Sequence, residues 1–210
     1  MTTPTEAMVK AADTLYQALT ENHPELPAVV FVVGYSGRKK NSQVHGHFAP
    51  ATWEGGAHEI FLSGESLGRG AEATATTIIH EAAHALGYAR DIGNTSNQGR
   101  YHNGEFKKLG EELGLTVEKD PEDTTRGYNM AEMTEETKAK YAYELKLLKA
   151  ALTTHRVVQT APAPKPKKST VVKVDCQCDH PFNINRKWWD ENGGSLHCND
   201  CFSDYEEVSE

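Results

Sequence analysis

The sequence predicts an α+β protein with a small, separate C-terminal unit. Short β-branched runs and longer stretches of helical periodicity alternate up to about residue 155. A proline- and lysine-rich segment then interrupts them, and all four cysteines follow it. With 210 residues, the chain is long enough for one medium domain and a small appendage. We therefore expect domains at 1–155 and 171–210, joined by a linker at 156–170.

The first part of the chain predicts one helix and three strands. Residues 4–21 place apolar side chains at helical spacing. Pro24 ends this helix, because the residue before a proline disfavours helical backbone. Residues 27–33 are a short β-branched run typical of a strand. Residues 46–49 and 58–62 predict two further strands.

Three more helices are expected before the linker. Residues 71–89 are rich in alanine and contain no proline, which predicts a helix buried on most sides. Glycine and asparagine in residues 91–100 indicate a loop. Residues 106–113 predict a short helix. Residues 134–152 predict a long one, with Thr134 as its N-cap.

The charge of the chain is unevenly distributed. The net charge is −8, made up of −6 over residues 1–155, +5 over residues 156–187 and −7 over residues 188–210. The negative net charge argues against binding of nucleic acid through electrostatic attraction to the protein as a whole. The local basic stretch predicts at most a weak nucleic-acid contact, through residues 156–189.

No stretch approaches the roughly 18 apolar residues that a membrane-spanning helix needs. The first twenty residues also lack the charged and then apolar segments of a secretory signal. We therefore expect a cytoplasmic protein without membrane partners. In that reducing compartment, clustered cysteines favour metal binding over disulfides.

The predicted helix 71–89 contains the pattern His80-Glu81-Ala82-Ala83-His84. Residues four apart share one face of a helix, so His80 and His84 can bind one zinc ion. Glu81 lies one step round, where it can take a proton from zinc-bound water and pass it to a leaving amine. The pattern predicts the catalytic zinc site of a metalloprotease, with protein as substrate.

Such a site needs a third protein ligand. Arg90 stands where the metzincin pattern has a histidine, which excludes that class. His102, between the loop and the short helix, is the better candidate, although a helix-capping role fits its position equally well. Glu105, Glu111 and Glu112 are the alternatives that a thermolysin-like enzyme would use.

The segment from His80 to His84, followed by a loop and His102-Asn103-Gly104-Glu105-Phe106, resembles the SprT-like metalloproteases, relatives of Spartan. The resemblance covers nearly the whole chain, and the chain is similar to small proteins encoded by actinobacteria and their phages. It implies a zincin-like domain, His102 as third ligand, a C-terminal zinc ribbon and DNA-associated proteins as substrates. Asn103 departs from the pattern, because it shifts the glycine by one position.

The cysteines form two close pairs at the spacing of a structural zinc site. They are Cys176, Cys178, Cys198 and Cys201. Four thiolates around a zinc ion can hold together a unit that is too small for its own core. The first pair is C-x-C rather than the usual C-x-x-C, so His180 or His197 could replace one cysteine. The sequence thus predicts one catalytic and one structural Zn²⁺.

The competing interpretation is a non-enzymatic, zinc-stabilised adaptor that binds DNA or protein and whose histidine site is structural. Glu81 separates the two interpretations, because a closed structural site takes four ligands and needs no general base. The sequence assigns no role to His45, His47 or His58, which lie near predicted strands.

Overall fold

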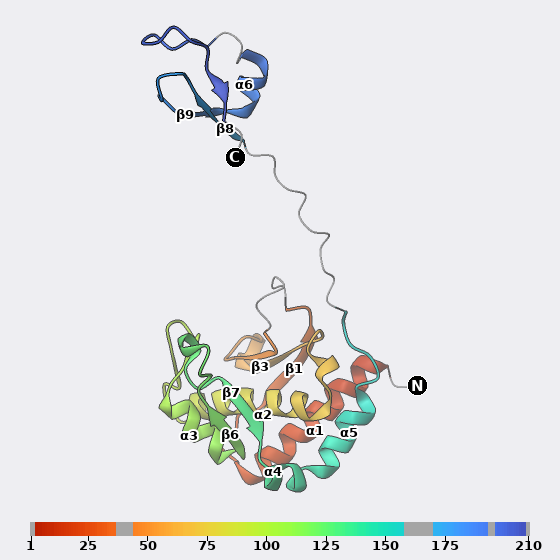
Figure 1. Ribbon diagram of the computed structural model, residues 1–210. Helices are drawn as coiled ribbons and strands as arrows, with labels where there is room; N and C mark the ends of the chain where they lie inside the picture. The colour runs from red at the N-terminus through yellow and green to blue at the C-terminus, as the bar shows by residue number, and fades with distance from the viewer. Residues whose placement is uncertain (1–2, 37–43, 158–169, 193–195, 209–210) are drawn as a thin grey trace. The chain divides into compact units, whose positions relative to one another are not determined.

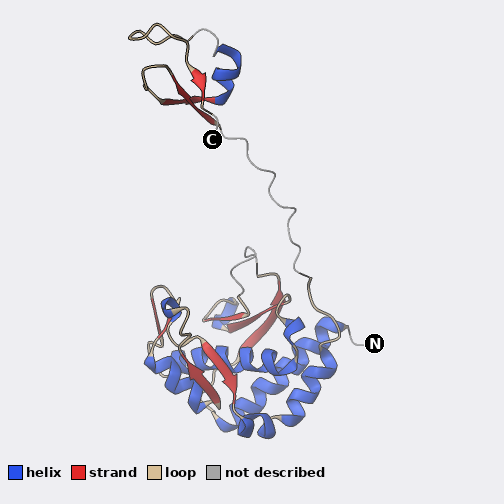
Figure 2. Ribbon diagram, in the orientation of Figure 1, coloured by secondary structure: helices blue, strands red, loops and turns tan. Residues whose placement is uncertain are grey.

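The computed structural model describes residues 3–36, 44–157, 170–192 and 196–208. The chain divides into two compact units, Met1–Gln159 and Thr160–Glu210. The division falls inside the predicted linker 156–170, most of which lies outside the described residues. Both units combine helices with small sheets, so the α+β class is confirmed (Figure 2).

Unit 1 contains a three-stranded sheet made of β1 (Val29–Gly34), β2 (Gly46–Ala49) and β3 (His58–Ser63). These strands confirm the three predicted ones. The strand order is β1-β3-β2, with β1 parallel and β2 antiparallel to β3. Phe31 and Ile60 are paired neighbours on β1 and β3, and both are buried. The short strand β2 forms one edge of this sheet.

Three helices of unit 1 pack on one another beneath the sheet (Figure 1): α1 (Pro4–Asn22), α2 (Ala71–Ala89) and α5 (Ala142–Ala151). Both α1 and α2 were predicted. The side chain of Thr3 accepts a hydrogen bond from the Glu6 N–H and caps α1. The centre of the core consists of fully or almost fully buried aliphatic side chains from the three helices: Leu15, Leu19, Ile78, Ile79, Leu86 and Leu148.

A two-stranded sheet that the sequence did not predict packs against α3 (Gly104–Glu112) and α2. Its strands are β6 (Leu115–Glu118) and β7 (Met130–Met133), which pair antiparallel. A Cβ atom on Gly110 would lie 2.8 Å from Val117 Cγ2. The glycine therefore allows α3 to approach β6 closely.

The predicted loop 91–100 also contains extended structure. Strand β4 (Thr95–Ser96) lies within it and pairs antiparallel with β5 (Tyr101–His102), which directly follows the loop. This short ladder fixes the backbone on both sides of the segment between the strands, and it brings His102 towards α2.

The prediction of one continuous helix over residues 134–152 is wrong. The structure has two helices, α4 (Glu135–Lys140) and α5, with Tyr141 between them at φ −104° and ψ 29°. The Tyr141 side chain is buried. Thr134 caps α4 as predicted, because its hydroxyl accepts the Thr137 N–H.

The described residues of unit 2 form a three-stranded antiparallel sheet with one helix: β8 (Val171–Asp175), β9 (Phe182–Asn185), α6 (Arg186–Asn192) and β10 (Glu206–Glu207). The strand order is β10-β8-β9. Val172 and Val174 are the buried aliphatic residues of β8. So small an apolar core suits a unit that needs an additional cross-link such as a metal ion.

In the described parts of both units, no helix is long and apolar enough to cross a membrane.

Candidate metal centres

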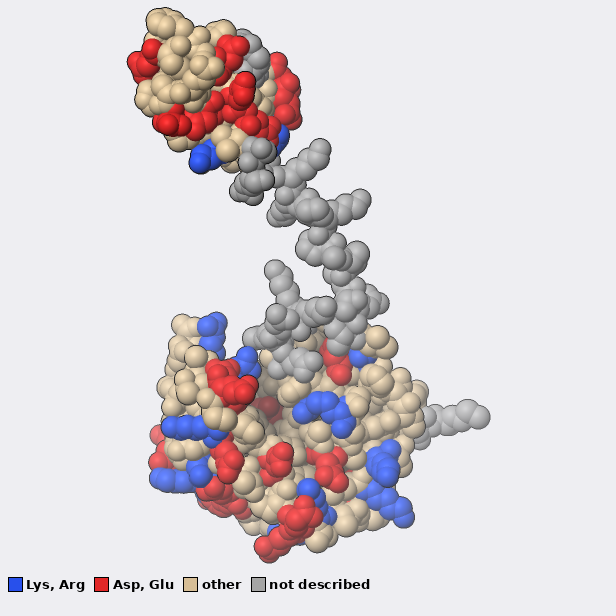
Figure 3. Space-filling view, in the orientation of Figure 1, with Lys and Arg blue, Asp and Glu red and all other residues tan. Residues whose placement is uncertain are grey.

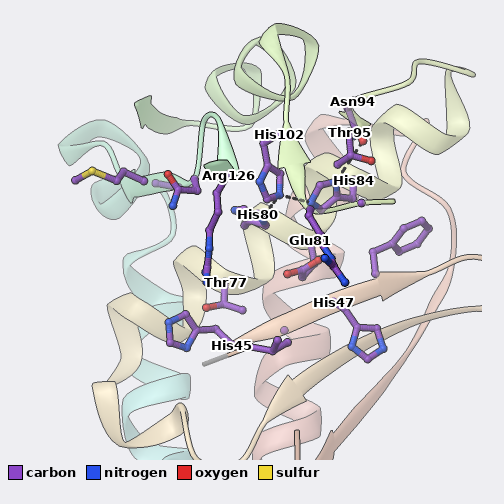
Figure 4. Close-up of a pocket in the computed structure, with 18 of the residues that line it drawn as sticks. His45, His47, Thr77, His80, Glu81, His84, Asn94, Thr95, His102 and Arg126 are labelled. Carbon is purple, nitrogen blue, oxygen red and sulfur yellow. Dashed lines mark hydrogen bonds between the residues drawn. The ribbon is translucent and has the colours of Figure 1, made fainter. Parts of the chain in front are cut away.

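Helix α2 presents His80 and His84 on one face, and His102 on β5 completes a group of three imidazoles (Figure 4). The Nε2 atom of His102 lies 3.2 Å from His80 Nε2 and 3.1 Å from His84 Nε2. Ligand nitrogens about 3.3 Å apart are expected when each lies 2.0–2.1 Å from one tetrahedral zinc ion. Two of the three nitrogen pairs thus have the spacing of ligands on one metal ion, and all three ligand nitrogens lie within 4.8 Å of one another.

Backbone contacts hold His102 in place. The Tyr128 N–H donates to its carbonyl oxygen at 3.0 Å. A Cβ atom on Gly127 would lie 2.1 Å from the same oxygen, and Gly127 has a φ of +68°. Only glycine tolerates both conditions, so the segment after η3 (Thr124–Arg126) packs directly against β5.

The departure at Asn103 has a structural explanation. Its side-chain oxygen accepts the N–H groups of Glu105 and Phe106 and so caps α3. Its amide also donates to the carbonyl of Gly93. The ring of the fully buried Phe106 then lies 4.4–4.8 Å from the three imidazole centroids. Asn103 thus helps to place the apolar wall behind the imidazoles.

The alternative carboxylate ligands are engaged elsewhere. Glu105 and Glu111 pair with Lys108 and Lys107, which lie on the same helix. Glu112 pairs with Arg90. Among the described residues, the group around His80 contains three ligand atoms, all from histidine.

Burial keeps the imidazoles neutral. Desolvation lowers the pKa of His80 well below its ordinary value, lowers that of His84 to about 4, and also lowers that of His102. Neighbouring imidazoles act in the same direction on the first two. A neutral imidazole keeps the lone pair that a metal ion requires.

Glu81 lies beside the imidazoles and is 5% exposed. Burial raises the pKa of its carboxyl to about 8, against a lowering by a hydrogen bond from the backbone of Phe48 on β2. A Cβ atom on Gly46 would lie 3.3 Å from Glu81 Cγ and 2.8 Å from Thr77 Cγ2. Gly46 therefore leaves room for this carboxylate, and a glycine inside a strand indicates such a close approach.

Asn94 is a site residue that the sequence analysis missed. It is 8% exposed, and its Oδ1 lies 3.3 Å from His84 Nδ1. Its Nδ2 donates to the carbonyl of Ala83 at 3.2 Å. An Nδ1–H that donates to Asn94 leaves the Nε2 of His84 as the nitrogen that faces the other imidazoles.

The imidazoles open into a cleft of ≈ 1670 Å³. Strand β2, the β4–β5 segment and the β6–β7 sheet all contribute to its walls. Two residues left without a role, His45 and His47, line it as well. A peptide has room to reach the three imidazoles and Glu81.

Unit 2 contains a second group of ligand atoms, from Cys176, Cys178, His180 and Cys198, which lie within 4.8 Å of one another. Cys178 Sγ is 3.4 Å from Cys176 Sγ, 3.6 Å from Cys198 Sγ and 3.4 Å from His180 Nδ1. The four cysteines are free thiols. Thiolate and imidazole together form a donor set that can hold a metal ion.

Cys201 lies next to this group without joining it. Its Sγ is 3.0 Å from Ser203 Oγ, and hydrogen bonds with Cys178 and Cys198 also act on its thiol. His197 pairs with Asp204 instead. Of the two histidines considered as substitutes, His180 is therefore the one at the group.

No protein-family model matches the chain. No curated protein matches it, and no solved structure matches it.

Proposed function

We propose that this chain is a zinc-dependent metallopeptidase of the SprT-like type with a zincin-like catalytic domain. One observation carries the proposal: the buried carboxyl group of Glu81 lies beside three convergent imidazoles, in a cleft whose volume is large enough for a peptide. Three ligands leave one position of a tetrahedral ion for water or substrate, and this distinguishes a catalytic from a closed structural site.

Zinc bound there would polarise the scissile carbonyl and lower the pKa of a bound water. In its ionised form, Glu81 would accept a proton from the attacking water and return it to the leaving amine. The positive charge of a bound zinc ion would favour that form, against the burial that raises the pKa of this carboxyl. Asn94 keeps His84 in the tautomer that offers Nε2. Phe106 excludes water from behind the imidazoles.

In unit 2 we propose a structural zinc ion, held by Cys176, Cys178 and Cys198 with either His180 or Cys201. The unit has few buried aliphatic residues, so a metal cross-link would supply much of its folding free energy. The whole chain would then bind two zinc ions.

The resemblance extends the proposal to DNA-associated protein substrates. In the basic segment, Arg156 pairs with Glu65 and Arg186 with Glu207. Acidic side chains cover much of the visible face of unit 2 (Figure 3). A weak nucleic-acid contact through 156–189 would therefore depend on the lysines of this segment, which include the exposed Lys173 and Lys187 of unit 2.

Replacing Glu81 tests the proposal. Glu81→Gln retains the size of the side chain but cannot accept the proton, so casein digestion should fall by on the order of 10²–10⁴-fold. Elemental analysis should find about two zinc equivalents in both proteins. The matched control is Glu72→Gln, on the same helix at an exposed ion pair with Lys138; it should digest casein at the wild-type rate.

Two outcomes would contradict the proposal. Equal digestion by wild type and Glu81→Gln would show that Glu81 is not the base. A zinc-loaded wild-type protein that cleaves no unfolded substrate would favour the non-enzymatic adaptor.

A further inference from the structure

Arg69 lies in the wall of the same cleft and has no part in the chemistry proposed above. It is the last residue of η2 (Leu67–Arg69), and Gly70 alone separates it from α2. Its Nη2 donates to Thr77 Oγ1 at 2.8 Å, and its Nε donates to the Ser66 carbonyl at 3.3 Å. The guanidinium is therefore held at a fixed place on the first turns of α2.

The charge of Arg69 is uncompensated. Its hydrogen-bond acceptors are carbonyl and hydroxyl oxygens, and it forms no ion pair with a carboxylate of the described residues. Arg126, in contrast, also lines the cleft but pairs with Asp123. Burial lowers the pKa of Arg69, yet a guanidinium stays protonated at neutral pH. A cation without a carboxylate partner among the described residues therefore faces the cleft.

His45 adds a second polar group at the same place. Its Nδ1 is 2.7 Å from Ser66 Oγ, which leaves Nε2 for another partner. In Figure 4, His45 and Thr77 lie on one side of Glu81, and Asn94 and Thr95 lie on the other. The cationic end of the cleft is therefore distinct from the end near the β4–β5 segment.

The position of Thr77 sets the distance from the reacting centre. Thr77 precedes His80 and Glu81 by three and four residues on α2, which is about 4.5–6 Å along the helix axis. An extended peptide advances about 3.3 Å per residue. A group bound at Arg69 would thus belong to a residue roughly two positions from the scissile bond.

We propose that Arg69, with His45, forms a subsite for the carboxylate of an aspartate or glutamate in the bound peptide, about two residues from the bond that is cleaved. The inference rests on the proposed peptidase function and specifies its substrate class. A guanidinium whose Nη1 is not engaged by the described residues can donate to a carboxylate in a charge-assisted hydrogen bond. A glutamine at the same position of the peptide carries no negative charge that could pair with Arg69.

Binding is measured first, because it does not depend on turnover. Full-length, zinc-loaded Glu81→Gln protein is titrated into fluorescein-labelled ten-residue peptides of alanine, serine and leucine. Each peptide carries one glutamate, placed at successive positions, and has a glutamine counterpart. At one or two adjacent positions, glutamate should bind about threefold to tenfold more tightly than glutamine, the range of a partly exposed, charge-assisted contact.

Second-site variants assign this preference to Arg69. Adding Arg69→Gln should bring the ratio to about one, Arg69→Lys should retain part of it, and Arg69→Glu should reverse it. The matched control is Arg100→Gln, which removes a charge from another part of the cleft lining and should leave the ratio unchanged. A purely structural role for Arg69 could weaken binding of both peptides but could not reverse their order.

Three results would overturn the inference: no peptide binds, glutamate and glutamine peptides bind equally, or the preference survives in Arg69→Gln. Digestion of casein by wild type, followed by mass spectrometry of the products, then separates the two proposals. Cleavage without an acidic preference would contradict the subsite alone. An Arg69-dependent binding preference without any cleavage would contradict the peptidase function alone.

Discussion

At the scale of single residues, metal binding at the first centre depends on the side chains that orient the ligand imidazoles as well as on the imidazoles themselves. Asn94 contacts His84 through its carbonyl oxygen and α2 through its amide. Asn94→Ala removes both contacts and should weaken metal binding at this centre by about 10–100-fold, because hydrogen bonds to a ligand imidazole orient it and raise its basicity. Zinc retained during dialysis against increasing chelator concentrations measures the effect.

The control for this substitution is Asn22→Ala, which removes an exposed side-chain hydrogen bond to Ala18 at the end of α1. It should retain zinc like wild type. If Asn94→Ala also retained zinc like wild type, the contact with His84 would have no part in metal binding.

The sequence placed some of these residues and not others, for a physical reason. His80, Glu81 and His84 belong to one helix, whose periodicity fixes their relative positions. His102 needed the family resemblance, since the β4–β5 pairing that brings it to α2 is only two residues long. Asn94 reaches His84 through the same loop, and local sequence does not encode that approach.

At the scale of elements, the C-terminal part of α2 is fitted to the loop that follows it. In an isolated helix, Gly87→Ala would gain about 0.5–1 kcal/mol. Here the new Cβ would lie 2.4 Å from Asn94 Nδ2 and 3.1 Å from Leu109 Cδ1. Overpacking of this kind costs about 1–3 kcal/mol, so the substitution should lower the free energy of unfolding, measured by urea denaturation.

Gly93→Ala is the comparison, because a Cβ there meets no atom within 4 Å. Its free energy of unfolding should stay within about 0.5 kcal/mol of wild type. Stabilisation by Gly87→Ala would show that the loop yields easily and that Asn94 is not held in place by packing.

The elements themselves were predictable where their pattern is long. Helices α1 and α2, at 19 residues each, agree with the predicted ranges to within a residue. No proline or glycine marks the break between α4 and α5 at Tyr141, so the sequence pattern does not predict it. Strands β6 and β7 have four residues each, and their pairing depends on packing against α3 rather than on a local pattern.

At the scale of the whole molecule, charge separates the parts of the chain. Residues 1–155 carry −6 and residues 188–210 carry −7, whereas residues 156–187 carry +5. Acidic regions repel phosphate, so any nucleic-acid affinity should reside in the basic segment. Arg156 and Arg186 are paired with carboxylates. Five lysines of the segment remain: Lys173 and Lys187 lie in unit 2, and three lie in the linker, Lys165, Lys167 and Lys168.

Replacing these three lysines with alanine in the full-length chain should weaken single-stranded DNA binding and flatten its salt dependence. Each phosphate contact on a single strand contributes about −0.7 to the slope of log K against log salt, so three lost contacts should reduce the slope by about 2. Fluorescence anisotropy of a labelled oligonucleotide at several salt concentrations measures it.

The control is a triple alanine variant of three exposed lysines in unit 1: Lys140, Lys146 and Lys149. It removes the same charge from an acidic surface and should leave the slope unchanged, and neither variant should alter casein digestion. Equal slopes in all three proteins would place the nucleic-acid contact outside the linker. Absence of binding by wild type would leave the peptidase proposal intact and would remove the support for DNA-associated substrates.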